Sequence, residues 1–141
     1  MAFVLDASVT LAWHFKDEET AFSRAIFERT IEETVVVPAH WWLEVANGIL
    51  MGERRKRATP DQAAPLVELL QALSIETDFI PGEHAFDRIL PLARAHRLTV
   101  YDAIYLEVAE RRGLGLATLD GALETAARSA GVSTMARLGS E

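Results

Sequence analysis

The N-terminal stretch Ala2-Phe3-Val4-Leu5 is followed at once by Asp6, and this step from apolar to acidic residues decides the expected fold. Four consecutive apolar residues predict a short strand buried on both faces, as the strands of parallel sheets are. A second run, Val35-Val36-Val37, is β-branched throughout and ends at Pro38, which lacks the amide needed to continue a sheet. The chain therefore begins with two strands of a buried sheet.

Amphipathic stretches alternate with short apolar runs along the rest of the chain, an alternation typical of an α/β domain. The spacing of apolar residues predicts a short helical turn over 9–15 and helices over 20–31, 40–51, 60–73, 83–96, 99–112 and 123–130. Further strands are expected over 74–80, 114–119 and 132–136. Pro91 is expected to kink the helix over 83–96, because proline cannot donate a helical hydrogen bond.

Composition narrows the class of protein. The 141 residues, 50% hydrophobic and 25% charged, predict one domain over residues 1–141, and the absence of cysteine excludes disulfides and thiolate metal sites. No apolar run approaches the roughly 20 residues of a membrane span, so a cytoplasmic protein is expected. The net charge of −7 argues against a protein that coats nucleic acid, but not against an enzyme that contacts it locally.

Most of the 21 acidic residues lie on polar helix faces, but four do not fit that account: Asp6, Glu44, Asp102 and Asp120. Asp6 and Asp120 directly follow predicted strands, while Glu44 and Asp102 lie near the starts of predicted helices. In a parallel sheet, ligands bind beyond the carboxyl ends of the strands, where the helices also begin. We therefore expect all four at one rim, although each taken alone could equally be a turn or capping residue.

Carboxylates gathered at one rim repel each other. Two charges 4 Å apart cost about 4 kcal/mol at an effective dielectric constant of 20, and a helix N-terminus offsets only about 0.3–1 kcal/mol. Either some acids stay protonated or a divalent cation binds, and oxygen ligands favour Mg²⁺ or Mn²⁺ over Zn²⁺. Such a cation suits phosphate chemistry, because it activates water and neutralises phosphate oxygens. No histidine is expected beside the acids, and no role is assigned to His14, His40, His84 or His96.

Four motifs carry a resemblance to a known family: Val4-Leu5-Asp6-Ala7-Ser8, Leu43-Glu44-Val45-Ala46-Asn47, Tyr101-Asp102-Ala103-Ile104-Tyr105 and Ala117-Thr118-Leu119-Asp120. In order and spacing they resemble the PIN domain, and the whole chain is similar to the VapC-type toxins of bacterial toxin–antitoxin pairs. The resemblance implies a three-layer α/β/α fold with a central parallel sheet of about five strands. It also implies a Mg²⁺- or Mn²⁺-dependent endoribonuclease that cleaves RNA, forms a homodimer and is occluded by an antitoxin protein.

The resemblance also assigns roles to residues. Asp6, Glu44, Asp102 and Asp120 match the acidic metal-binding and catalytic set, and Ser8, Asn47 and Thr118 match positions that support it. The implied reaction is in-line attack of a metal-bound water on a phosphodiester. Gly121 stands where relatives sometimes carry another polar or acidic group, so one cation and two cations both stay open.

Two further features suggest contacts with other molecules. The basic run Arg54-Arg55-Lys56-Arg57 is either a site for RNA phosphates outside the acidic rim or a solvated loop. Trp41 and Trp42 are adjacent, so both cannot face the core of one helix. The exposed one, with Ile49 and Met51, either forms an interface for a second copy or an antitoxin, or packs under a neighbouring loop.

Two other functions fit parts of this pattern. A non-catalytic binding module could keep the PIN fold without activity, although all four acids are present. A phosphoaspartate-type enzyme also places an aspartate after the first strand. A phosphatase of that kind would have a second Asp where Ser8 stands, and a receiver domain would have a lysine after a late strand, whereas the lysines here are Lys16 and Lys56.

Overall fold

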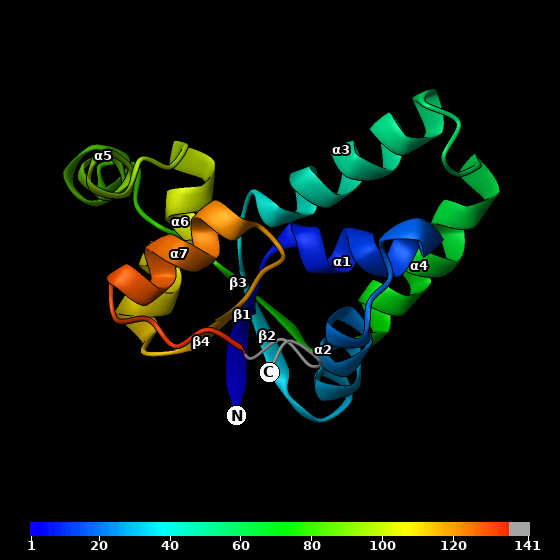
Figure 1. Cartoon of the computed structure of the whole chain (residues 1–141), viewed down its shortest axis with the longest axis horizontal. Helices are drawn as coiled ribbons and strands as arrows, with labels where there is room; N and C mark the ends of the chain where they lie inside the picture. The colour runs from blue at the N-terminus through cyan, green and yellow to red at the C-terminus, as the bar shows by residue number, and fades with distance from the viewer. Residues whose placement is uncertain (136–141) are drawn as a thin grey trace.

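A parallel sheet lies between two layers of helices in the computed structural model, which describes residues 1–135 (Figure 1). The strands are β1 (Ala2–Leu5), β2 (Thr34–Pro38), β3 (Ile75–Asp78) and β4 (Gly115–Ala117), in the order β3-β2-β1-β4. One layer consists of α1 (Ala7–His14), α2 (Ala21–Glu32), α3 (Trp41–Arg54) and α4 (Pro60–Ala72). The other consists of α5 (Leu90–His96), α6 (Val100–Arg112) and α7 (Gly121–Ser129). The predicted three-layer α/β/α class is confirmed.

The two central strands form the core of the sheet. Phe3, Val4 and Leu5 of β1 and the three valines 35–37 of β2 are all buried. Phe3 is in register with Val35 on one side and with Gly115 on the other. Helices cover both faces of the sheet, which explains why the two strands are apolar along their whole length instead of alternating.

The expected fifth strand is reduced to one pairing. Thr134 makes an isolated parallel bridge with Leu116, and residue 136 lies outside the described part of the chain. The predicted strand over 114–119 is also shorter, because β4 ends at Ala117 and residues 118–120 turn into the start of α7. Among residues 1–135 the sheet therefore has four strands.

The predicted helix over 83–96 is present as an uninterrupted helical run over 84–96. Its first turns include the π-helical segment η2 (Ala85–Ile89), which continues directly into α5, and Pro91 lies at the start of α5. The predicted turn over 9–15 is a full helix, α1, which begins directly after Asp6. A 3-10 turn, η1 (Lys16–Glu18), connects α1 to α2. Within residues 1–135, no helix is both long and apolar enough to cross a membrane.

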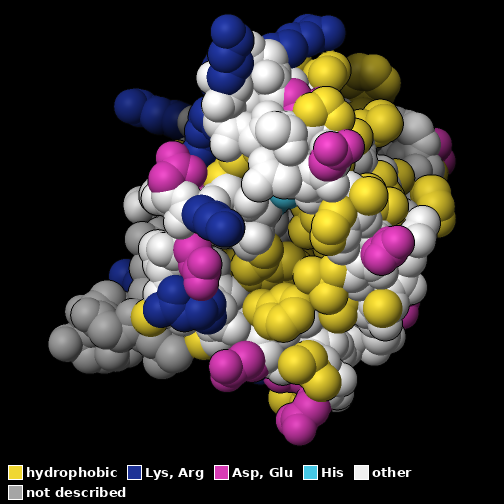
Figure 2. All heavy atoms as spheres, turned by 90° about the vertical axis from the view of Figure 1, so that its right-hand side faces the viewer, with side chains coloured by type: hydrophobic (Ala, Val, Ile, Leu, Met, Phe, Trp, Pro, Cys, Tyr) yellow, Lys and Arg dark blue, Asp and Glu magenta, His cyan; other side chains and the backbone are white. Residues whose placement is uncertain are grey.

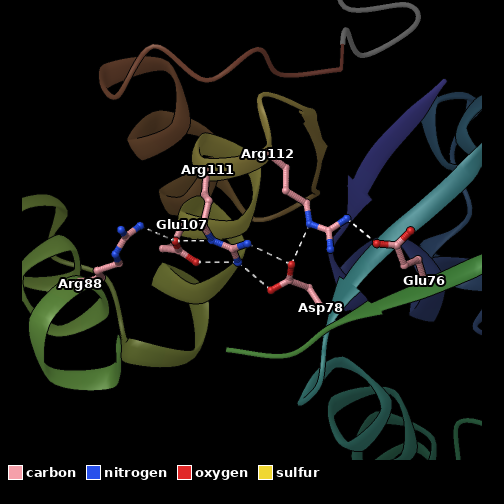
Figure 3. Close-up of polar contacts among 6 residues, drawn as sticks. All are labelled: Glu76, Asp78, Arg88, Glu107, Arg111 and Arg112. Carbon is pink, nitrogen blue, oxygen red and sulfur yellow. Dashed lines mark hydrogen bonds and ion pairs between the residues drawn. The ribbon is translucent and has the colours of Figure 1, made fainter. Parts of the chain in front are cut away.

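Ion pairs fasten α6 to the edge strand β3 (Figure 3). Asp78 is buried at the end of β3 and accepts hydrogen bonds from Arg111 Nη2 and Arg112 Nε, each at 2.7 Å. Arg111 Nε also donates to buried Glu107 at 2.8 Å. Burial raises the pKa of Asp78, but the bonds from the two arginines outweigh it and leave that pKa lowered. The network fixes the C-terminal half of α6, the helix whose first turns carry Asp102 and Tyr105.

Candidate metal and nuclease site

Asp6 is held at the end of β1 by two hydroxyl groups. Its amide continues the sheet by donating to the Ala117 carbonyl at 3.0 Å, and its carboxylate Oδ2 accepts from Ser8 Oγ at 2.6 Å and Thr118 Oγ1 at 2.7 Å. The side chain is buried. Burial raises the pKa of Asp6 to about 6; the Ser8 and Thr118 hydroxyls lower it, and the charges of Glu44 and Asp102 raise it further.

Asp120 is tied to Asp6 through the same hydroxyl group. Thr118 Oγ1, which donates to Asp6, accepts from the Asp120 amide at 3.0 Å, and Ser8 Oγ accepts from the Leu119 amide at 3.0 Å. These bonds join the turn after β1 to the turn after β4. Asp120 Oδ1 also accepts from the amides of Ala122 and Leu123, so this residue does cap α7.

Glu44 comes from the first turn of α3, the helix that follows β2. Its Oε1 accepts a hydrogen bond of 2.5 Å from the Tyr105 hydroxyl and lies 3.3 Å from His40 Nε2. Burial raises the pKa of Glu44; the bond from Tyr105 lowers it and the charge of Asp102 raises it.

Asp102 lies in the first turn of α6, where its amide donates to the side chain of the N-cap residue Thr99 at 3.2 Å. Burial raises the pKa of Asp102, and the charge of Asp120 adds to this, while Thr99 and His40 lower it. Asp102 is thus electrostatically coupled to each of the other three acids.

The fold therefore gathers the four acids into one electrostatic environment beyond the carboxyl ends of β1, β2 and β4. Within residues 1–135, no three Asp, Glu or His side chains converge closely enough to form a ready-made metal site. The donor chemistry nevertheless fits a hard cation, since every acid offers carboxylate oxygen and three have a raised pKa. A divalent cation bound among them would remove the repulsion that contributes to those shifts.

Comparison with known proteins identifies the fold family. The model of the PIN domain matches residues 3–129. This chain belongs to the PIN domain family. The predicted resemblance is confirmed.

Similar proteins agree with this assignment to the PIN domain. Ribonuclease VapC3 of Pyrobaculum aerophilum is 32% identical over 129 residues, which cover 85% of this chain and 90% of the relative. The crystal structure of PAE2754 from Pyrobaculum aerophilum is 27% identical, with a TM-score of 0.66 and coverage of 95% of this chain and 92% of that one. The crystal structure of Mycobacterium tuberculosis VapC20, a toxin that cleaves the sarcin-ricin loop, has a TM-score of 0.65 at 15% identity. The match covers 88% of this chain and 94% of that one.

The expectation that no histidine lies beside the acids of this PIN domain was wrong. His40 is one turn before Glu44 on α3, and its ring packs on Tyr105 with the ring centroids 5.2 Å apart. The i, i+4 spacing of His40 and Glu44 was the available signal. Tyr105 was also missed as a polar neighbour of the site, although it lies one turn after Asp102 on α6.

The other expected site residues are mostly exposed. Asn47 is exposed one turn after Glu44. In the basic run, Arg54, Arg55 and Lys56 are exposed, whereas Arg57 Nη2 pairs with Asp17 and Glu18 at 3.0 and 2.5 Å. The Arg57 guanidinium also lies 4.2 Å from the ring centre of Phe15. The tryptophan pair divides as expected, with Trp41 buried and Trp42 exposed.

Proposed function

We propose that this PIN domain is a Mg²⁺- or Mn²⁺-dependent endoribonuclease and the toxin of a toxin–antitoxin pair. The observation that carries the proposal is the coupling of Asp6, Glu44, Asp102 and Asp120 at one rim of the sheet. The similarity of this chain to Ribonuclease VapC3 supports RNA as the substrate. The cytoplasm is the proposed location, since RNA is available there.

Asp6, Glu44 and Asp102 would hold one cation, and Asp120 would complete that site or serve a second ion. When bound, the cation lowers the pKa of a water molecule and neutralises charge on the phosphodiester. Asp6 is suited to anchor the site because Ser8 and Thr118 fix one of its oxygens. A carboxylate of this set can also orient the attacking water. Asn47 stays a proposed supporting residue.

Removal of divalent cations tests the reaction class. With excess chelator we expect cleavage of a mixed-sequence RNA to fall by roughly a hundredfold or more, and added Mn²⁺ or Mg²⁺ to restore it. Fragment mapping by gel electrophoresis would locate the cleavage sites. Cleavage that persists at full rate in chelator would contradict metal dependence. An increase in melting temperature on adding Mn²⁺ without any RNA cleavage would instead favour the non-catalytic binding module.

The partners follow from the same proposal. A ribonuclease toxin needs an antitoxin to protect the cell that makes it, and Figure 2 shows apolar side chains gathered in a hollow on the face formed by α1 to α4. The same layer of helices carries a pocket of about 220 Å³ lined by Trp13, Phe27 and Leu69 together with Glu19 and Arg24. We propose this face for the antitoxin, and the exposed Trp42 with Ile49 and Met51 for a homodimer. A short DNA-binding protein encoded beside this gene, able to suppress RNA cleavage, would support the antitoxin proposal.

The basic run at the end of α3 is proposed to contact RNA phosphates through Arg54, Arg55 and Lys56. In chelator, which prevents cleavage, we expect the triple change to Gln to weaken RNA binding and to lower the slope of log affinity against log salt by about 2 for single-stranded RNA. Arg57→Gln is the matched control, because Arg57 is engaged by Asp17 and Glu18. Equal slopes for the wild type and the triple variant would exclude this contact.

A further inference from the structure

Tyr105 lies among the four carboxylates and carries a neutral hydroxyl group. Its ring is buried completely in the middle of α6, one turn beyond Asp102 on the same helix face. From there its hydroxyl reaches α3, 61 positions away in the sequence, and donates to Glu44 Oε1 at 2.5 Å. A hydrogen bond from a neutral hydroxyl to a carboxylate is short and among the stronger kinds.

The phenol is a permanent donor. Burial, followed by the charges of Asp6 and Glu44, raises the pKa of Tyr105 well above its usual range, so the proton stays on the ring oxygen at any working pH. The backbone of Ala7, which directly follows Asp6, opposes part of this rise in pKa. The phenol thus lies beside the Asp6 turn and bonds the side chain of Glu44.

Glu44 needs such a contact more than Asp6 does. Asp6 is buried and held by two hydroxyls, whereas Glu44 is half-buried and its longer side chain has more rotamers to lose. Among residues 1–135, the side chains that bond or pair with the Glu44 carboxylate are Tyr105 and His40, whose Nε2 lies 3.3 Å from Oε1. The position of the Glu44 carboxylate relative to the other acids therefore depends on the Tyr105 hydroxyl.

The structure assigns Tyr105 as a positioning residue that holds Glu44 Oε1 toward Asp6 and Asp102, so that Glu44 is ordered before a divalent cation binds. This inference rests on the proposed function, because it gives Glu44 the role of a metal ligand. Groups that orient the ligands of a metal typically change metal affinity or activity by 10–100-fold when they are removed.

Tyr105→Phe is the direct test, because it removes the hydroxyl and keeps the buried ring. We expect the dissociation constant for Mn²⁺, measured by calorimetric titration of the protein without RNA, to rise by about 10–100-fold. In RNA cleavage we expect kcat at fixed Mn²⁺ to fall while the KM for RNA stays unchanged. Tyr101→Phe is the matched control on the same helix: its side chain is 63% exposed, its ring also lies against His40, and we expect both quantities to stay within twofold.

A double-mutant cycle with Glu44→Gln separates positioning from general damage to the site. If Tyr105 acts through Glu44, Tyr105→Phe changes Mn²⁺ affinity by less than twofold once Glu44 is Gln. An equal loss in both backgrounds, or Mn²⁺ affinity and kcat unchanged in a folded Tyr105→Phe protein, overturns the assignment while leaving the proposed nuclease intact. A wild-type protein that neither binds Mn²⁺ nor cleaves RNA overturns the proposed function itself, and the assignment with it.

Discussion

Asp6→Asn is expected to reduce RNA cleavage by roughly a hundredfold or more and, without metal, to make the protein more stable at neutral pH. Both effects have one cause, the burial of a carboxylate beside Glu44 and Asp102. Asn keeps the shape and can still accept hydrogen bonds from Ser8 and Thr118, but it carries no negative charge. RNA cleavage therefore falls while the stability of the metal-free protein rises, as expected for a buried charge that serves the reaction and not the fold.

The pH dependence gives the sign of the stability effect. The pKa of Asp6 is raised by burial from 3.8 unfolded to about 6 folded, so the native state binds more protons between these values. The free energy of unfolding of the metal-free wild type should therefore fall as pH rises through this window, by up to about 3 kcal/mol from this group. Asp6→Asn should lack that fall.

Urea denaturation in chelator at pH 4 and pH 7.5, with RNA cleavage measured in parallel, checks both parts. Asp87→Asn is the control, because Asp87 is exposed in η2 and no loss of cleavage is expected there. If Asp6→Asn cleaves RNA as fast as the wild type, Asp6 has no part in the reaction. If the two proteins differ in stability equally at both pH values, the ionised Asp6 carboxylate does not destabilise the native state.

What could be predicted from the sequence was local. Four apolar residues before Asp6 were enough to place that carboxylate at the end of a buried strand, because a short strand in a parallel sheet has few other arrangements. The N-terminal positions of Glu44 and Asp102 in their helices likewise followed from helical spacing. These patterns depend on neighbours within a turn or a strand, and the three-layer class follows from them.

Contacts between distant elements could not be predicted in the same way. The bond from Tyr105 to Glu44 depends on where α6 and α3, which lie in different layers, are placed relative to the sheet, and neither helix determines that placement alone. The same holds for Asp78, which a weak strand pattern over 74–80 gave no reason to pair with arginines at the end of α6. His40 is different. Its i, i+4 spacing from Glu44 can be read from the sequence, and the expectation that no histidine lies beside the acids did not use that spacing.

Asp78→Asn is expected to lower the free energy of unfolding by about 3 kcal/mol, because it leaves two arginines facing a neutral, buried amide. Only 2% of the Asp78 side chain is exposed, and it accepts hydrogen bonds from both Arg111 and Arg112. Glu76→Gln is the matched control: Glu76 also pairs with Arg112, but its side chain is 53% exposed. Exposed pairs contribute about 0–1 kcal/mol, so urea denaturation at pH 7 should separate the two variants clearly.

The two aspartates should respond to acid in opposite directions. The pKa of Asp78 is lowered in the folded protein, because the arginine bonds outweigh burial. Its stabilisation is therefore present above the unfolded pKa of 3.8 and is lost as pH falls through the folded pKa, so the wild type's advantage over Asp78→Asn should shrink below about pH 4. Asp6, whose pKa is raised, has the opposite effect.

Because Asp78 stabilises α6 from the end opposite the acids, Asp78→Asn should retain cleavage within a few-fold at temperatures where it stays folded. A large loss of cleavage by the folded variant would show instead that the ion pairs set the position of Asp102 and Tyr105.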